Sequence, residues 1–171
     1  MPDANQSTRP GPTAHPLHVL PGYPFPTTEE GVLPWSWASD RLARATNYWL
    51  ATTRPDGRPH VAPLWGSWVD DALYFDGSPQ TRWARNLAQN PAAAINLESG
   101  FDVVIVEGVV DDFVTDAALA ERILADWNGK YGKLPPEPAG RGMWRFRPRA
   151  ARGWGANLED GTRWTFPPVP D

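Results

Sequence analysis

Residues 47–77 are NYWLATTRPDGRPHVAPLWGSWVDDALYFDG, a stretch with three apolar and aromatic runs separated by two turn signals. The turn at Pro55-Asp56-Gly57 is favoured because proline presets one backbone dihedral and glycine accepts a positive φ. Asp70-Asp71 marks the second turn. The stretch therefore predicts a β-meander, with strands at residues 48–53, 60–69 and 72–76.

The pattern continues on both sides of this meander as short strands with a few helices. Helices are expected at residues 36–45, 79–89 and 115–129, and further strands at residues 92–98, 101–113, 143–154 and 162–166. Ser36, Ser78 and Thr115 are the expected N-caps, because hydroxyl oxygens accept hydrogen bonds from the first-turn N–H groups. The fold is then mainly β with helices, and a small antiparallel barrel is its simplest closure because it removes exposed sheet edges.

The length of 171 residues suits one compact domain. Residues 1–33 are rich in Pro, Gly and Thr without periodicity, and we interpret them as an arm that is disordered or laid across a partner. The domain proper is expected at residues 34–171.

Composition excludes several classes of function. The net charge of −4 and pI of about 5.3 argue against a general nucleic-acid binder. The chain has no cysteine, and its three histidines are too scattered to form a metal site. It shows neither a run of about 20 apolar residues nor a signal peptide, so we expect a cytoplasmic protein without a membrane partner. No catalytic motif is present, and the catalytic residues stay unknown.

An anion site is predicted at the start of the helix at residues 79–89. A helix N-terminus presents free N–H groups and a partial positive charge. The hydroxyls of Ser78 and Thr81 lie beside it, and Arg82 and Arg85 are three residues apart and can share one side. A phosphate group is the expected occupant. The alternative is that both arginines are solvated or are paired with acidic neighbours.

The second strand of the meander has features that suit a flat ligand. His60, Ala62 and Leu64 should face one way, and Val61, Pro63 and Trp65 the other. Pro63 cannot donate a hydrogen bond, which indicates an edge, a bulge or a close ligand. The alternative is a barrel strand with one irregularity.

Three ordered segments, LATTRPDGRPHVAPLW, ALYFDGSPQTRWARNL with NPAAAINLE, and VVIVEGVV, resemble the pyridoxamine 5'-phosphate oxidase-like split-barrel flavoproteins. That group includes flavin- and deazaflavin-dependent oxidoreductases. The resemblance implies a six-stranded split β-barrel and a homodimer. It also implies FMN, or alternatively deazaflavin F420, bound in clefts between the subunits.

Carried over by resemblance, the residues that flank the cofactor ring are His60, Val61, Ala62, Pro63 and Trp65, and those at its phosphate are Ser78, Thr81, Arg82 and Trp83. Many members have a lysine at the position of Trp83, so the choice of cofactor stays open. The implied function is an oxidoreductase acting on an unidentified small organic substrate. The alternatives are a non-enzymatic cofactor-binding protein and a barrel that has lost its cofactor.

Overall fold

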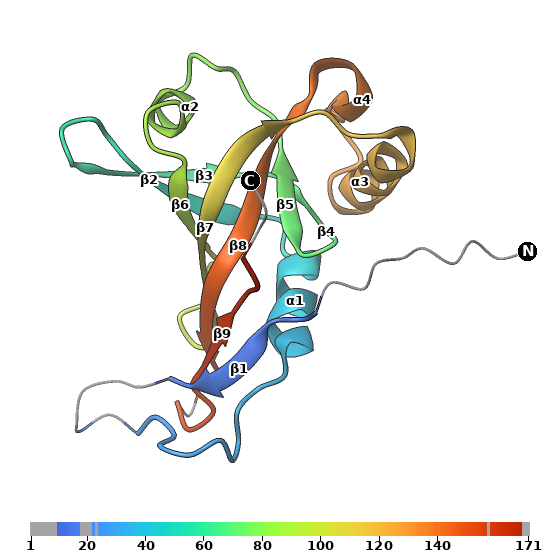
Figure 1. Cartoon of the computed structure of the whole chain (residues 1–171). Coiled ribbons are helices and arrows are strands. Elements are labelled where there is room, and N and C mark those ends of the chain that lie inside the picture. The colour runs from blue at the N-terminus through green and yellow to red at the C-terminus, as the bar shows by residue number, and fades with distance from the viewer. Residues whose placement is uncertain (1–9, 18–21, 23, 157, 169–171) are drawn as a thin grey trace, which may run out of the picture.

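The computed structural model describes residues 10–17, 22, 24–156 and 158–168. Nine strands form one sheet, and four helices pack around it (Figure 1). The strands are β1 Thr13–Pro16, β2 Tyr48–Thr53, β3 Pro59–Leu64, β4 Ser67–Val69, β5 Ala72–Phe75, β6 Ala92–Asn96, β7 Val103–Phe113, β8 Met143–Trp154 and β9 Thr162–Thr165. The helices are α1 Trp35–Arg44, α2 Arg82–Leu87, α3 Ala117–Lys130 and α4 Pro138–Arg141.

The sheet is antiparallel and follows the order β1-β9-β8-β7-β6-β2-β3. Strand β8 is long enough to branch, because its first part pairs with β5 and its last part with β9. Strand β4 pairs with β5, and no described strand joins β3 to close the sheet. The prediction of a mainly β antiparallel fold is confirmed, whereas the sheet has nine described strands rather than the six of the expected split barrel, and it does not close.

The sheet stays open at β3 because the strand is interrupted at Trp65-Gly66. The single strand expected at residues 60–69 is instead two strands, β3 and β4, which pair with different neighbours. A side chain at Gly66 would overlap Leu73 Cδ1 at 2.8 Å and the Tyr74 carbonyl oxygen at 2.9 Å. The chain therefore turns here with glycine closely packed against β5.

The core lies between the sheet and helices α1 and α2. Alternation along β2 places Tyr48 and Leu50 inside, both with no exposed surface. Burial of such large side chains is the main favourable term in folding, at about 1.5–3 kcal/mol each. The other large side chains of this core include Phe75, Ile95, Phe146 and Trp164.

The three expected N-caps are each wrong by one to three positions. Helix α1 begins after Pro34 rather than Ser36, and α2 is capped by Thr81 rather than Ser78. Helix α3 is capped by Asp116, whose carboxylate accepts a hydrogen bond from the Leu119 N–H at 2.8 Å. In each case a neighbouring residue with the required extended backbone takes the position.

Part of the predicted arm joins the sheet. Thr13–Pro16 forms β1 and pairs with β9, with Thr13 opposite Thr165. The sequence has no periodicity that would indicate this strand. The domain boundary at residue 33 stays a prediction, and residues 1–9 lie outside the described part. Among the described helices, none has the length and apolarity needed to cross a lipid bilayer.

Residues at the end of α3 hold the interruption between β3 and β4, Trp65-Gly66, in its position. The Tyr131 hydroxyl accepts a hydrogen bond from the Gly66 N–H at 3.1 Å and donates one to the Thr46 carbonyl at 2.9 Å. The Tyr131 ring stacks on Trp65, with centroids 4.6 Å apart and an interplanar angle of 8°. These contacts fix the direction in which β3 ends.

We expect Tyr131→Phe to lower the free energy of unfolding by about 1–3 kcal/mol, because it leaves the buried Gly66 N–H without its acceptor. The ring stack on Trp65 stays intact in this variant. Urea unfolding followed by tryptophan fluorescence measures the change. An unchanged midpoint would show that the hydroxyl does not hold the break.

A second prediction concerns Gly108, which lies at the register shift between β7 and β8. A methyl group there would overlap the Arg147 carbonyl oxygen and Phe146 Cζ. Gly108→Ala should therefore destabilise the protein by about 1–3 kcal/mol in thermal or urea unfolding. Gly129→Ala is the control, because a methyl at this position in α3 meets nothing within 4 Å. It should be neutral or stabilising by up to about 1 kcal/mol.

Candidate functional site

Among the described strands, β3 has a partner on one side only, so it is a free edge, which is one of the three alternatives that Pro63 indicated. Pro63 pairs with Trp49 and Pro59 with Thr53, so the two prolines sit four residues apart on the same edge strand. Neither has an N–H group, and the edge is therefore a poor template for a further strand. The unpaired edge stays open to a small ligand.

The predicted alternation of β3 is confirmed by exposure. His60, Ala62 and Leu64 are half-buried or buried, whereas Val61 is 53% exposed and Trp65 is 36% exposed. The outer surface of β3 thus presents apolar side chains to solvent. The structure places the five predicted ring residues along this one edge.

An aromatic cluster lies where β3 ends. Trp65 contacts Tyr131 face to face and Trp127 edge to face, with ring centroids 6.3 Å apart in the second pair. Lys133 Nζ lies 5.3 Å from the centre of the Trp65 ring. Trp65 is thereby held rigidly while one part of it remains exposed. The contribution of Tyr131 and Lys133 could not be inferred from their sequence positions.

A half-buried lysine, Lys130, lies beside this cluster in the sequence and contacts the Gly66 carbonyl at 3.5 Å. Lys130 Nζ lies 2.9 Å from Asp126 Oδ2 and donates a hydrogen bond to the Tyr48 hydroxyl at 3.2 Å. Burial lowers the pKa of Lys130, and the neighbouring Asp126 carboxylate partly offsets this effect. Burial also raises the pKa of Tyr48 far above its ordinary value. Tyr48 therefore stays neutral and acts as a hydrogen-bonding group.

The predicted anion segment surrounds the start of α2. The Thr81 hydroxyl accepts a hydrogen bond from the Ala84 N–H at 3.3 Å, and the Ser78 hydroxyl accepts one from the Gln80 N–H at 3.2 Å. Arg82 is the first residue of α2, so its N–H and that of Trp83 have no acceptor within the helix. These two amides remain available at the helix start.

Arg82 and Arg85 are both exposed. Among the described residues, neither arginine takes part in an ion pair, so of the two alternatives left by the sequence they are solvated rather than paired with acidic neighbours. A cation at the first turn of a helix is unfavourable by about 0.3–1 kcal/mol without a compensating anion. The segment therefore keeps an uncompensated positive charge.

Trp83 is placed differently from the other predicted phosphate residues. Its side chain is 6% exposed and packs in the core, with its ring 5.4 Å from Phe75 and 5.5 Å from Trp144. Gly77 leaves room for it, since a side chain there would overlap Trp83 Cζ2 at 2.5 Å. Only the backbone N–H of Trp83 can face a ligand at the helix start.

A hydrogen-bond relay joins this segment to the edge strand. Asn86 Nδ2 of α2 donates to Thr52 Oγ1 of β2 at 3.0 Å, and Thr52 Oγ1 contacts the His60 carbonyl of β3 at 3.5 Å. Asn86 is 1% exposed and Thr52 is buried. The relay sets α2 against β2 and β3, so α2, which carries the two arginines, lies beside the edge that holds the predicted ring residues. Sequence analysis missed Asn86, although a polar residue on the apolar side of a helix is a usable signal.

One small cavity lies close to the start of α2. A cavity of about 220 Å³ between the linker before α2 and β8 is lined by Gly77 and Pro79, with carboxylates from Asp76 and Asp112. An anion would be disfavoured in that cavity, so it does not suit the predicted phosphate.

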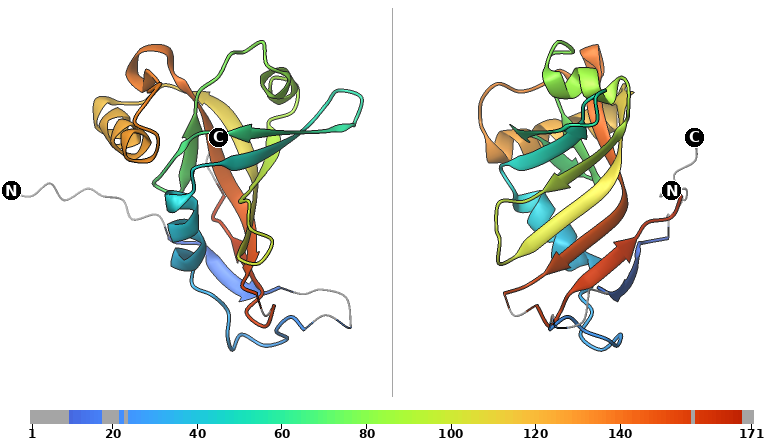
Figure 2. Two further views of the ribbon diagram at one scale, coloured as in Figure 1. Left: turned by 180° about the vertical axis from the view of Figure 1, so that it is seen from behind. Right: turned by 90° about the vertical axis from the view of Figure 1, so that its left-hand side faces the viewer.

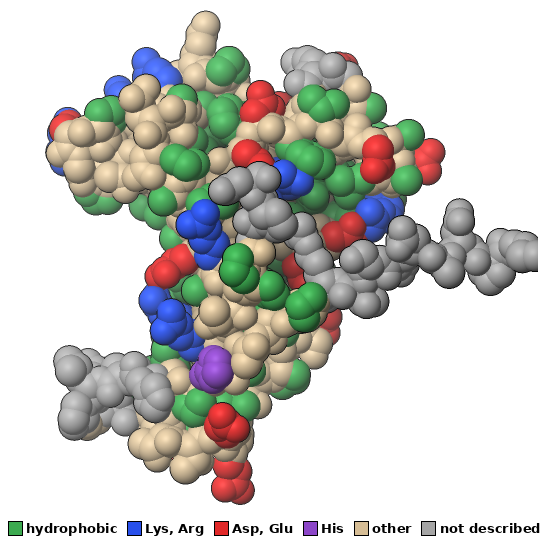
Figure 3. Space-filling view, in the orientation of Figure 1, with side chains coloured by type: hydrophobic (Ala, Val, Ile, Leu, Met, Phe, Trp, Pro, Cys, Tyr) green, Lys and Arg blue, Asp and Glu red, His purple; other side chains and the backbone are tan. Residues whose placement is uncertain are grey.

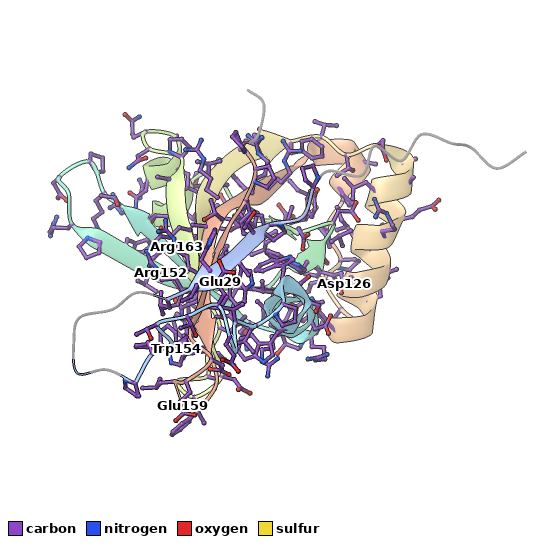
Figure 4. All side chains as sticks on the ribbon, turned by 60° about the horizontal axis from the view of Figure 1, so that its bottom comes forward. Glu29, Asp126, Arg152, Trp154, Glu159 and Arg163 are labelled. Carbon is purple, nitrogen blue, oxygen red and sulfur yellow. The ribbon has the colours of Figure 1, made fainter. Side chains whose placement is uncertain are left out.

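A separate pair of arginines lies at the opposite end of the sheet. Arg152 and Arg163 are register partners on β8 and β9. Together with Glu29 they line a cavity of about 580 Å³ (Figure 4). Arg152 Nη1 is paired with Glu107 at 2.8 Å. Figure 3 shows basic and acidic side chains interspersed over the face that it presents, without one basic patch. Within the described ranges, no three metal-ligating side chains gather at one point.

Comparison with known proteins agrees with this architecture. A conserved hypothetical protein from Mycobacterium tuberculosis has 23% sequence identity and a TM-score of 0.61, over 76% of this chain and 89% of that one. An F420 reductase has 30% identity and a TM-score of 0.52, over 66% of this chain and 94% of that one. A heme binding protein from Mycobacterium smegmatis has 21% identity and a TM-score of 0.54, over 72% of this chain and 55% of that one.

A search of curated protein sequences found no significant match. Residues 38–155 match the sequence profile of the pyridoxamine 5'-phosphate oxidase family. This segment contains β3, α2 and the relay between them. Since the match covers well over half of the chain, this protein belongs to the pyridoxamine 5'-phosphate oxidase family, which confirms the resemblance inferred from the sequence.

Proposed function

We propose that this protein is an oxidoreductase that binds FMN, or alternatively the deazaflavin F420, and acts on a small organic substrate. The observation that carries the proposal is the Asn86–Thr52–His60 relay, which sets unpaired cations beside an open, apolar sheet edge. Family membership supports the proposal, and the 30% identity to an F420 reductase keeps the deazaflavin as a candidate.

The residues present fit such a cofactor. Arg82, Arg85 and the first amides of α2 supply the positive charge and donors that a terminal phosphate needs. The Ser78 hydroxyl accepts a local hydrogen bond and can still donate one, whereas the Thr81 hydroxyl already donates to the Ser78 carbonyl at 2.9 Å. Val61 and Trp65 offer an apolar surface for a ring system.

A flavin or deazaflavin supplies hydride transfer when it is bound. The residues of this chain would bind and orient the cofactor and keep water from one side of its ring. The stacked Trp65 and Tyr131 rings form a rigid wall, and the relay through Asn86 fixes the spacing between ring and phosphate. His60 could donate a hydrogen bond near the ring. The catalytic groups that contact substrate are not assigned, and a cytoplasmic location stays a prediction.

We also propose that the working form is a homodimer with the cofactor between the subunits. In Figure 2 (right), one face of β6, β7 and β8 is turned toward the viewer. Helix α1 packs on the opposite face, and no described helix covers the face that is turned toward the viewer. A shallow hollow of about 470 Å³ crosses this face and is lined by small side chains that include Ala51, Ala92 and Ala94. Such a flat surface of small residues suits close approach of a second sheet.

The cofactor assignment is tested by titrating FMN, F420 and riboflavin and following tryptophan fluorescence. One phosphorylated cofactor should bind at one equivalent per chain and quench the exposed Trp65. Riboflavin, which lacks the phosphate, should bind at least about tenfold more weakly, because it makes no charge-assisted contact. Absence of binding by both cofactors would overturn the proposal. Binding without reduction of any hydride acceptor would favour the non-enzymatic alternative.

The role of Arg82 is tested by Arg82→Ala, which should weaken cofactor binding by about 1–3 kcal/mol. Arg44→Ala is the matched control, since Arg44 is also exposed, lies on a helix and forms no ion pair with a described residue. Its affinity should equal that of the unmodified protein. Equal losses in the two variants would indicate a general charge effect and remove Arg82 from the site.

A further inference from the structure

Another cavity, of about 490 Å³, lies between β5, β8 and the two ends of the described chain. Its size falls in the range of small-molecule sites. One wall is apolar and is formed by Pro12, Pro148, Phe166 and Pro167. Strands β7, β6 and β2 separate β8 from β3 in the sheet, so within one protomer this cavity is distinct from the proposed cofactor edge.

The β8 side of the cavity carries excess positive charge. Arg145 and Arg147 both line it, and both are paired with one carboxylate, that of Asp111. Arg145 makes two hydrogen bonds to Asp111, at 3.0 and 2.7 Å, and Arg147 Nη2 lies 3.1 Å from the same group. Arg147 Nε is buried and has no hydrogen-bond partner among the described residues. Two guanidinium groups around one carboxylate leave one positive charge uncompensated.

Tyr74 adds a hydroxyl to this end of the cavity. Its side chain is 4% exposed and lies in the β5 segment that pairs with β8. Burial raises the pKa of Tyr74, an effect that the nearby Arg145 partly opposes. Tyr74 is therefore a neutral donor beside the arginines.

The carboxylates at the other end of the cavity are engaged by partners of their own. Asp70 forms an ion pair with Arg122 at 2.5 Å. Asp71 Oδ1 accepts hydrogen bonds from Trp35 Nε1 at 2.9 Å and from Ser39 Oγ at 3.2 Å. Among the described residues that line the cavity, the one buried donor without a hydrogen-bond partner, Arg147 Nε, thus lies at the β8 end, and the ligand that this end fits is an acceptor.

We propose that this cavity binds a small monocarboxylic acid, with its carboxylate on Arg147 and Tyr74 and its apolar body against Pro148 and Phe166. A planar guanidinium group matches a carboxylate in shape. Arg145 and Arg147 carry one positive charge more than Asp111 neutralises, which suits a monoanion, because a dianion would add repulsion from Asp111 and from Asp71 at the other end of the cavity. An apolar body fills the cavity without leaving polar groups unpaired.

Calorimetric titration of the full chain with phenylacetate and its neutral analogue phenylacetamide tests this site. The acid should bind at least about tenfold more tightly than the amide, since only the acid makes the charge-assisted contact. Arg147→Gln should abolish that preference. Arg149→Gln is the matched control, because it makes the same charge change two residues further along β8, and Arg149 does not line the cavity. It should keep affinity within about twofold of the unmodified protein.

Two further measurements keep the test decisive if Arg147→Gln disturbs folding. Tyr74→Phe should weaken phenylacetate binding severalfold without affecting the amide. In amide NMR spectra, phenylacetate should shift the signals of Ala72 and Arg147 and leave those of β3 unchanged. Equal binding of acid and amide, no binding of the acid, or shifts confined to β3 would each overturn the proposal. The titration needs no cofactor, so its failure leaves the proposed oxidoreductase function unaffected.

Discussion

The arrangement of the site depends on how the chain is held at Trp65-Gly66. Gly66 is packed so closely against β5 that no side chain fits, and its N–H is bound by the Tyr131 hydroxyl. Its carbonyl faces Lys130 Nζ at 3.5 Å. The backbone polar groups that would otherwise continue β3 into β4 are therefore bound by the end of α3. Strand β3 stops here and its outer edge remains unpaired.

An unpaired sheet edge is a hazard unless it is protected, because its free backbone groups attract other strands. In this protein Pro59 and Pro63 remove two donors from β3, and the edge is short. The same features leave a surface that a small planar molecule can approach. Protection against aggregation and accessibility to a ligand thus have one structural origin.

The two cationic sites differ in how their charge is held. Arg82 and Arg85 are exposed and form no ion pair with a described residue, so an anion bound there competes with water and salt. Arg145 and Arg147 are largely buried and are held in place by Asp111. Such preorganised guanidinium groups favour a ligand of defined shape. The first site suits a terminal phosphate at a helix start, and the second suits a compact carboxylate.

The local features of the meander were predictable from sequence. Turn chemistry at Pro55-Asp56-Gly57 and alternation along β3 depend on backbone dihedrals and side-chain period, which neighbouring residues determine. The ordered segments around them were sufficient to indicate the family. The predicted ring residues fall on one edge because consecutive residues of a strand cannot separate.

Other features depend on partners far apart in the chain. The Asn86–Thr52 contact joins residues 34 positions apart, and Tyr131 reaches Gly66 across 65 positions. The burial of Trp83, the branching of β8 and the pairing of Thr13–Pro16 with β9 likewise depend on long-range packing. The sequence by itself therefore determined most of the extended segments from residue 48 onward, and it predicted where an anion could bind. Only the tertiary structure decided that the sheet stays open at β3, because hydrogen bonds and close packing from the end of α3 and from β5 stop that strand.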